Sequence, residues 1–217
     1  MNEALLQSKG SSADVIHSKV LKLVDSMPTH SSRLLDLGCG QGTFLNRVIS
    51  LNKFQVTGAD GYHYPELDSA KIPFLKIDLN STLPIDDQTF DIVTAIEVIE
   101  HLENPRHFIR EIHRILKPKG LAIITTPNNE SITSLLSLFL RGYFSAFAPD
   151  CYPAHITPVL QIDLERILKE LQFKNISTLY TNEGRLPGSS LHWQTIGKPF
   201  FQGKWFSDNY MMMGQKG

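Results

Sequence analysis

The sequence predicts an α/β fold in which helices cover a mostly parallel sheet with an antiparallel last strand. Short apolar runs alternate with segments of helical spacing, the order that parallel strands joined by helices require. The first and fifth runs, residues 33–37 and 121–126, are almost continuously apolar, as expected of strands buried on both faces. The last two runs are joined without a clear helix, which favours an antiparallel hairpin at the sheet edge.

The individual elements follow from periodicity and punctuation. Apolar positions at helical spacing predict helices over residues 12–26, 43–51, 105–117 and 159–172. Apolar runs predict strands over residues 33–37, 54–59, 74–77, 90–96, 121–126, 176–181 and 210–214. The third helix has the clearest start, because the N-cap residue Asn104 is followed by Pro105.

The composition is that of an ordinary globular protein. Of 217 residues, 41% are hydrophobic and 20% are charged, which suits one domain with a substantial core. We expect a single domain over residues 1–217. It would carry an N-terminal helical segment at 1–30, an insert at 127–158 and a hairpin insert at 182–206.

Charge and cysteine content disfavour several classes of protein. The chain has 21 Lys and Arg against 22 Asp and Glu, so no overall basic excess is present to bind a nucleic acid. Cys39 and Cys151 cannot form a disulfide framework, and neither lies in a CxxC zinc pair. Residues 1–9 do not resemble a signal peptide, and the longest apolar-rich stretch, 135–140, is too short to span a bilayer. We therefore expect a cytoplasmic protein.

A glycine-rich loop follows the first strand. Gly38, Gly40 and Gly42 alternate with Cys39 and Gln41, so the backbone can turn sharply and approach a ligand closely. A helix begins after the loop, and helix N-termini favour negatively charged ligand groups. A tight turn without a ligand is the alternative that the loop alone leaves open.

Three acids at successive strand ends support a ligand site. Asp36 lies inside the first strand, Asp60 ends the second, and Asp78 ends the third and is followed by Leu79. Open α/β sheets bind ligands at the carboxyl ends of their strands, so the three carboxylates should line one crevice. Asp36 would repel a pyrophosphate and attract a cation. The pattern suits a ligand with ribose, amines and positive charge, and it argues against a nicotinamide-dependent oxidoreductase.

Taken together, these motifs make the chain resemble the class I S-adenosylmethionine-dependent methyltransferases, especially the ubiquinone-biosynthesis O-methyltransferases. The resemblance rests on the segments LDLGCGQG, VTGAD, FDIVTAIEVIEHL and LKPKGLAIITTPN, in the order of the family's motifs. It implies a Rossmann-like seven-stranded sheet with helices on both faces. It also implies S-adenosyl-L-methionine as cofactor.

The resemblance assigns roles to particular residues. It places Gly38, Cys39 and Gly40 under the methionine part of the cofactor, with Gly42 completing the loop. Asp36 would lie near the amino group of the methionine and Glu97 beside the methionine. Asp60 would bind the ribose hydroxyls, Asp78 the adenine amino group, and the Leu79 amide a ring nitrogen of the adenine. Gly61 stands where many relatives have a hydrophobic residue that stacks on adenine. Tyr62 or Leu79 would take that role here.

Candidate catalytic groups follow the fourth strand. His101 has the intrinsic pKa of a general base near neutral pH, and the resemblance implies a Glu-His pair here, which Glu100 and His101 supply. The distant His155 precedes the final amphipathic helix, where many relatives carry a residue that faces the acceptor. An alternative is that His101 only caps a loop and orders the cofactor site. A second alternative is a metal site, since Glu97, Glu100, His101 and His155 resemble the metal ligands of small-RNA 2′-O-methyltransferases. The segment around His155 lacks the second neighbouring histidine of those enzymes, so we predict no metal.

The acceptor side is less specific. The insert at 127–158 is rich in Leu and Phe, and the hairpin insert interleaves aromatic residues with Arg185, Lys198 and Lys204. These segments could line an acceptor pocket, touch a membrane surface, form a subunit contact, or simply cover the sheet edge.

We expect methyl transfer to an oxygen, and less so to nitrogen or carbon, of a small metabolite or a glycan or lipid precursor. Two alternatives stay open: a cofactor-binding regulatory protein without turnover, and a metal-dependent RNA methyltransferase. The sequence does not predict the oligomeric state.

Overall fold

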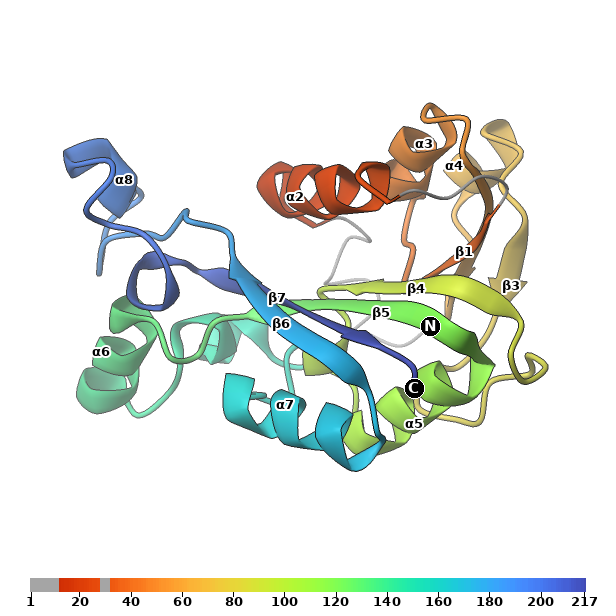
Figure 1. Ribbon diagram of the computed structural model, residues 1–217. Coiled ribbons are helices and arrows are strands. Elements are labelled where there is room, and N and C mark those ends of the chain that lie inside the picture. Colours follow the sequence, from red (N-terminus) through yellow and green to blue (C-terminus); the bar gives the residue numbers. More distant parts are fainter. Residues whose placement is uncertain (1–11, 28–31) are drawn as a thin grey trace.

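The computed structural model describes residues 12–27 and 32–217. Its centre is a seven-stranded sheet in the order β3-β2-β1-β4-β5-β7-β6 (Figure 1). The strands are β1 (Ser32–Leu37), β2 (Phe54–Asp60), β3 (Phe74–Lys76), β4 (Phe90–Ile96), β5 (Leu116–Pro127), β6 (Lys174–Tyr180) and β7 (Asn209–Gln215). Only β7 among them runs antiparallel to its neighbours, β5 and β6. The predicted mixed sheet with an antiparallel last strand is confirmed.

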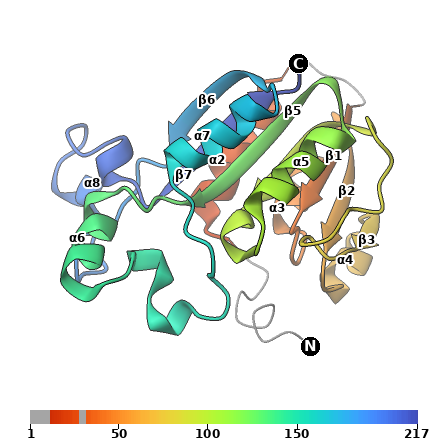
Figure 2. The same ribbon diagram turned by 90° about the horizontal axis from the view of Figure 1, so that it is seen from below.

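Helices cover both faces of the sheet, as predicted. One face carries α2 (Asp14–Asp25), α3 (Thr43–Ile49) and α4 (Pro65–Ser69), and the other carries α5 (Pro105–Ile115) and α7 (Gln161–Glu170). Figure 2 shows α5 and α7 lying across the second face. Two further helices, α6 (Ile132–Arg141) and α8 (Trp193–Ile196), project beyond the end of the sheet in Figure 1.

The sheet divides the core into two layers, because successive side chains of a strand point to opposite faces. In β1, Leu34 packs in the layer beneath α2 and α3, whereas Leu35 and Leu37 pack in the layer beneath α5 and α7. In β4, Ile92 and Val93 divide in the same way. All five side chains are buried, which fixes the register of the two central strands and the place where they end.

The junction between α5 and β5 differs from the prediction. The helix begins where expected, since the Asn104 side chain accepts a hydrogen bond from the His107 N–H at 2.9 Å. It ends at Ile115, and β5 starts at Leu116 rather than 121. Pro118 disfavours helical geometry at Lys117, whose ammonium group instead binds the Asp91 carboxylate at 2.8 Å. A register shift between Phe90 and Ile92 accommodates the longer strand.

The two inserts contain more helix than the sequence indicated. Residues 182–206 include the short helix α8 and a 3-10 turn at Lys204–Phe206. Helix α6 lies in the 127–158 insert and packs mainly on the 3-10 turns at Ser145–Phe147 and Lys204–Phe206. Of the expected N-terminal segment, α2 is helical as predicted, while residues 1–11 and 28–30 lie outside the described residues. Among the residues described, no helix is long and apolar enough to cross a membrane.

Candidate active site

A cavity of about 570 Å³ opens at the carboxyl ends of β1, β2 and β4, and the start of α2 forms part of its wall. Most of the site residues predicted from the sequence line it. They are Asp36, Gly38, Cys39, Asp60, Gly61, Asp78, Leu79, Glu97, Glu100, His101 and His155. Gly40 and Gly42 are not among the lining residues. The fold therefore gathers into one place side chains that are up to about 120 positions apart in the chain.

The glycine loop packs closely against neighbouring side chains. Gly38 has φ +73°, and a Cβ atom there would lie 2.4 Å from Cγ2 of Val98. Gly42 has φ +78° at the start of α3, where a Cβ would lie 2.7 Å from Leu67. Both positions therefore require glycine. Cys39 is buried within the loop, and burial raises the pKa of its thiol far above the ordinary value, so it acts as a packing group.

Asp60 is held by the backbone at the end of β2. One carboxylate oxygen accepts the Gly40 N–H at 3.0 Å and the other accepts the Tyr62 N–H at 3.1 Å. The side chain is 8% exposed, and its burial raises the pKa of the carboxyl. Each oxygen keeps a second lone pair, so Asp60 can accept two further hydrogen bonds from a ligand in the cavity.

Asp78 and Leu79 lie just past the end of β3. Asp78 is exposed and accepts hydrogen bonds from the Asn80 N–H at 3.0 Å and the Ser81 hydroxyl at 2.8 Å. Leu79 lines the cavity, whereas Tyr62 does not and instead contacts Tyr64 edge-on with ring centroids 4.8 Å apart. Of the two predicted stacking residues, Leu79 is the one placed to meet a ligand ring.

Asp36 is an acid buried in the centre of β1. Its carboxylate accepts a hydrogen bond from the Thr94 hydroxyl at 2.6 Å. The pKa of Asp36 is raised to about 7. Burial is the main cause, the Thr94 hydrogen bond opposes it, and the neighbouring Asp60 adds to it. A cation bound in the cavity would favour the ionised form of this carboxyl.

A pair of glutamates follows β4. Glu97 accepts hydrogen bonds from the Thr125 hydroxyl at 2.8 Å and from the side-chain amide of Asn209 at 2.6 Å, and burial raises its pKa to about 7. Glu100 is fully buried, and one of its oxygens accepts from the Thr126 hydroxyl at 3.1 Å. Burial, followed by the charge of Glu97, raises the pKa of Glu100 well above the usual value. Its other oxygen, Oε1, has no partner among the described residues.

Two histidines contact each other beside the glutamates. The rings of His101 and His155 meet edge-on with centroids 4.8 Å apart. His101 Nδ1 lies 2.8 Å from the Ala154 carbonyl, and His155 Nδ1 lies beside the Ala146 carbonyl. A carbonyl can only accept, so Nδ1 of each ring carries a proton and donates it to that carbonyl. Burial lowers the pKa of His101, which keeps the ring neutral near pH 7 and able to accept a proton.

Glu100, His101 and His155 also form a possible metal-ligand group. One ligand atom from each lies within 4.8 Å of the others. Two imidazoles and one carboxylate are suitable ligands for a divalent transition metal. Glu97 is not part of this group, so the predicted four-residue ligand set is only partly brought together.

Some residues of the cavity were not predicted. His17 on α2 lines it, is buried and contacts Phe44 with ring centroids 5.9 Å apart; burial lowers its pKa. Asn209 reaches it from β7, far along the chain. The sequence carries no signal for either residue. It does carry one for the buried threonines that bond to the acids, such as Thr94 and Thr125, because a hydroxyl inside an apolar strand needs a hydrogen-bond partner.

Comparison with known proteins agrees with this geometry. A family model described as a methyltransferase domain matches residues 12–178. The ubiquinone biosynthesis O-methyltransferase of Rickettsia bellii (strain OSU 85-389) is 31% identical over 124 residues, covering 54% of this chain and 50% of its own length. That of Rickettsia typhi is 27% identical over 146 residues, covering 61% and 58%. The chain thus spans about half the length of the curated relatives it matches.

Solved structures share the fold at low sequence identity. A SAM dependent methyltransferase from Archaeoglobus fulgidus is 19% identical with a TM-score of 0.69, and 97% of each chain is covered. A SAM-dependent methyltransferase of Thermotoga maritima, titled a possible histamine N-methyltransferase, is 18% identical with a TM-score of 0.66, covering 94% of this chain and 92% of its own. At these identities the likeness shows the fold alone.

Proposed function

The chain belongs to the class I S-adenosylmethionine-dependent methyltransferases, and from that premise we propose that it transfers a methyl group from S-adenosylmethionine to a hydroxyl oxygen of a small acceptor. The observation that carries this proposal is the His101 ring, which lines the cavity and which the Ala154 carbonyl orients through Nδ1 at 2.8 Å. A hydroxyl nucleophile must lose its proton during transfer, and a neutral imidazole beside the cavity is suited to accept it.

The donor set of the cavity fits the cofactor. Asp36 and Glu97 both have pKa values raised to about 7, so a positively charged ligand is the partner that would stabilise their ionised forms. Asp60, held by two backbone N–H groups, would accept the two ribose hydroxyls with its remaining lone pairs. Asp78 and Leu79 would meet the adenine. When bound, the cofactor supplies a methyl group on a sulfonium that leaves as a neutral thioether.

The remaining groups position the acceptor. In this proposal His101 accepts the acceptor's proton, and His155, packed edge-on against it, fixes the orientation of the ring. The unpartnered Glu100 Oε1, with its strongly raised pKa, is in position to donate a hydrogen bond when protonated. By holding nucleophile and methyl group in line, such a site lowers the entropic part of the barrier to transfer.

The acceptor class follows from the surroundings of the cavity. The overall net charge of −1 disfavours a long nucleic acid. Asp150, Cys151, Ala154 and His155 line the cavity together with the cofactor residues, and exposed apolar side chains lie on α6, which precedes this segment. The relatives' name refers to ubiquinone biosynthesis, and we extend to this chain only the acceptor chemistry: a hydroxyl on a small metabolite, or on a glycan or lipophilic precursor.

The test is methyl transfer from radiolabelled cofactor to a panel of phenols, sugars and lipophilic alcohols, with matched amines as controls. We expect label on the hydroxyl acceptors and a rate that falls sharply in His101→Gln. Label on the amines alone would contradict oxygen transfer. Cofactor binding without transfer to any acceptor would favour a regulatory protein without turnover.

A second candidate is metal-assisted transfer to an oxygen, as in the metal-dependent RNA methyltransferases considered above. The convergence of Glu100, His101 and His155 within 4.8 Å favours it. A bound divalent ion would lower the pKa of the acceptor hydroxyl, and His101 would then be a ligand rather than a base. Activity abolished by a chelator and restored by one divalent ion would support this candidate, whereas full activity in the chelator would exclude it.

A further inference from the structure

A second cavity, of about 520 Å³, lies between α6 and the loop of residues 185–190. The segment 145–151 contributes to both cavities, since Ser145 and Ala148 line the second while Asp150 and Cys151 line the first. In Figure 1, α6 lies beyond the end of the sheet, away from the β1 and β2 strand ends that carry the glycine loop and Asp60. No role in the proposed methyl transfer uses the second cavity.

The charged side chains that line this cavity are both arginines. Arg141 and Arg185 line it, and no carboxylate side chain does among the residues that the structure describes. Arg141 is exposed at the end of α6 and forms no ion pair within residues 12–27 and 32–217. Arg185 donates to Asp208 through Nε at 2.8 Å, which leaves its terminal nitrogens for a ligand.

A stripe of polar side chains on α6 faces the same loop. Thr133, Ser137 and Arg141 are four residues apart, so they lie on one side of the helix. The Thr133 hydroxyl donates to the Arg185 carbonyl, which ties the helix to the loop. The stripe and the loop therefore form two walls of one site.

Ser137 is the observation that points to a ligand. It lines the cavity, is 9% exposed, and its hydroxyl has no hydrogen-bond partner among the described residues. A serine inside a helix ordinarily bonds back to the carbonyl four residues earlier, and this one does not. A buried hydroxyl without a partner is unfavourable, and a change of χ1 rotamer that turns it toward a ligand oxygen in the cavity would satisfy it.

The chemistry of the walls indicates the ligand class. A guanidinium group can donate two parallel hydrogen bonds to two oxygens of one phosphate, and hydroxyl groups can donate to the same oxygens. Further hydroxyls line the cavity beside the arginines, from Tyr143, Ser145, Ser189 and Ser190. We propose that the second cavity binds the phosphate group of a phosphorylated, hydroxyl-bearing molecule, either a free sugar phosphate or the headgroup of a phospholipid.

The test is calorimetric titration of glucose 6-phosphate into the full chain, with glucose as the neutral control, and sedimentation with vesicles of phosphatidylglycerol or phosphatidylcholine. We expect saturable binding of the phosphate-bearing probe and none of glucose or phosphatidylcholine. Binding of glucose 6-phosphate alone identifies a free phosphate ester as the source. Binding of phosphatidylglycerol vesicles alone identifies a lipid headgroup.

Variants locate the site. Arg141→Gln should weaken binding at least tenfold and Ser137→Ala about threefold, because each removes a donor to the phosphate. The matched control Arg110→Gln changes an exposed arginine on α5 that does not line either cavity, and should leave binding unchanged. No binding of either phosphate probe at millimolar concentration, or equal weakening by Arg110→Gln, would overturn the proposal. Titration of S-adenosylmethionine into the same variants should be unaffected, which separates this proposal from the cofactor site.

Discussion

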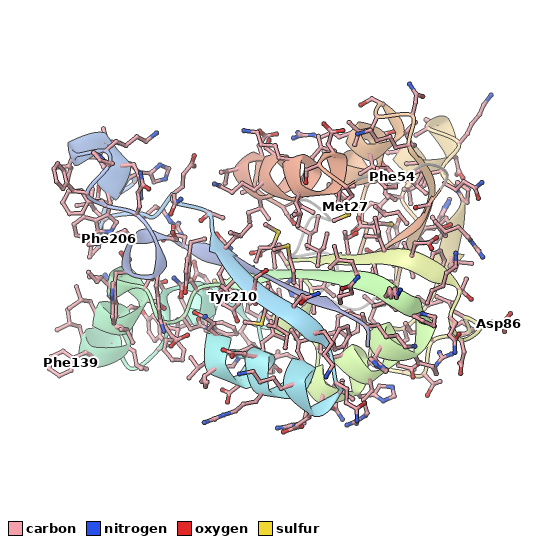
Figure 3. The ribbon with its side chains drawn as sticks, in the orientation of Figure 1. Met27, Phe54, Asp86, Phe139, Phe206 and Tyr210 are labelled. Atoms are coloured by element: carbon pink, nitrogen blue, oxygen red, sulfur yellow. The ribbon has the colours of Figure 1, made fainter. Side chains whose placement is uncertain are left out.

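The two large cavities share the segment 145–151 but are built in different ways. The first is formed by the ends of central strands, with carboxyl groups whose pKa values burial raises. The second is formed by a projecting helix and a loop about fifty residues later, with exposed arginines and hydroxyls. Figure 3 shows the difference in setting between buried and projecting parts: Tyr210 lies on β7 inside the molecule, while Phe139 projects from α6 at the edge.

This contrast shows that the pKa values of groups on a rigid sheet can be shifted strongly, because the surrounding core holds those groups in place. The two arginines on α6 and its loop, Arg141 and Arg185, are exposed and act through charge and hydrogen bonding. We therefore expect substitutions in the first cavity to have large effects on rate, stability and pH dependence, and substitutions on the outer face of α6 to have small ones.

The largest effect is expected from His101→Gln. Loss of a general base typically lowers the rate by about 10²–10⁴-fold, and the affinity for cofactor should remain near that of the unchanged protein. The measurement is the single-turnover rate of methyl transfer as a function of pH. In the variant, the part of the pH–rate profile in which the rate rises as His101 loses its proton should disappear. His107→Gln on α5, outside the cavity, is the matched control. An equal loss in both variants would refute the role of His101.

Gly38→Ala should destabilise the fold by about 2–5 kcal/mol, combining a left-handed backbone with an overlap against Val98. Gly188→Ala is the matched control, because Gly188 has φ +69° but nothing lies within 4 Å of its added Cβ. It should lose only about 1–2 kcal/mol, the backbone part. Denaturant unfolding measures both. Equal losses would show that the contact with Val98 is unimportant.

Cofactor affinity should rise with pH. Asp36 and Glu97 have pKa values raised to about 7, so both hold protons below that pH and must release them when a cation binds. The affinity should increase by up to roughly tenfold per pH unit for each proton released, and level off above pH 7. In the cofactor-free protein the same shifts mean that stability falls as pH rises from about 4 to 7.

Calorimetry between pH 5.5 and 8 measures this dependence, and Asp36→Asn should reduce its slope. An affinity that does not vary with pH in the unchanged protein would contradict the role given to these two acids.

The smallest effect is expected on the outer face of α6. Phe139 is 85% exposed, so Phe139→Ser should change the free energy of unfolding by less than about 0.5 kcal/mol. Phe108→Ala, at a position 1% exposed in the core, should lose about 3–5 kcal/mol. A large loss from Phe139→Ser would mean that this side chain is covered in solution.

The same contrast explains what could be predicted from the sequence. The strand ends, the glycine loop and the acids Asp36 and Asp60 form one contiguous pattern, so local spacing predicts both fold and site. His101 and His155 were placed in one site only through the resemblance, because the sequence has no periodic signal for how residues 145–155 fold back. His17 and Asn209 were missed for the same reason, because they reach the cavity only through tertiary packing.

The second cavity was not predicted at all. The sequence shows an apolar insert and an aromatic hairpin insert, but not that Ser137 faces the loop carrying Arg185. Likewise, the end of α5 was misplaced because helical spacing continues to Lys117, whereas Pro118 and the ion pair with Asp91 favour an earlier start of β5.

The most direct test of the central claim is calorimetric titration of S-adenosylmethionine into the unchanged protein, Asp60→Asn and the control Asp86→Asn. Asp60 lines the first cavity, whereas Asp86 does not and lies at the edge of the molecule in Figure 3. We predict saturable binding that Asp60→Asn weakens by about 1.5–3 kcal/mol, as loss of a charged hydrogen-bond acceptor should, with no change in Asp86→Asn. Absence of binding to the unchanged protein, or equal binding by all three, would contradict the assignment of this cavity to the cofactor.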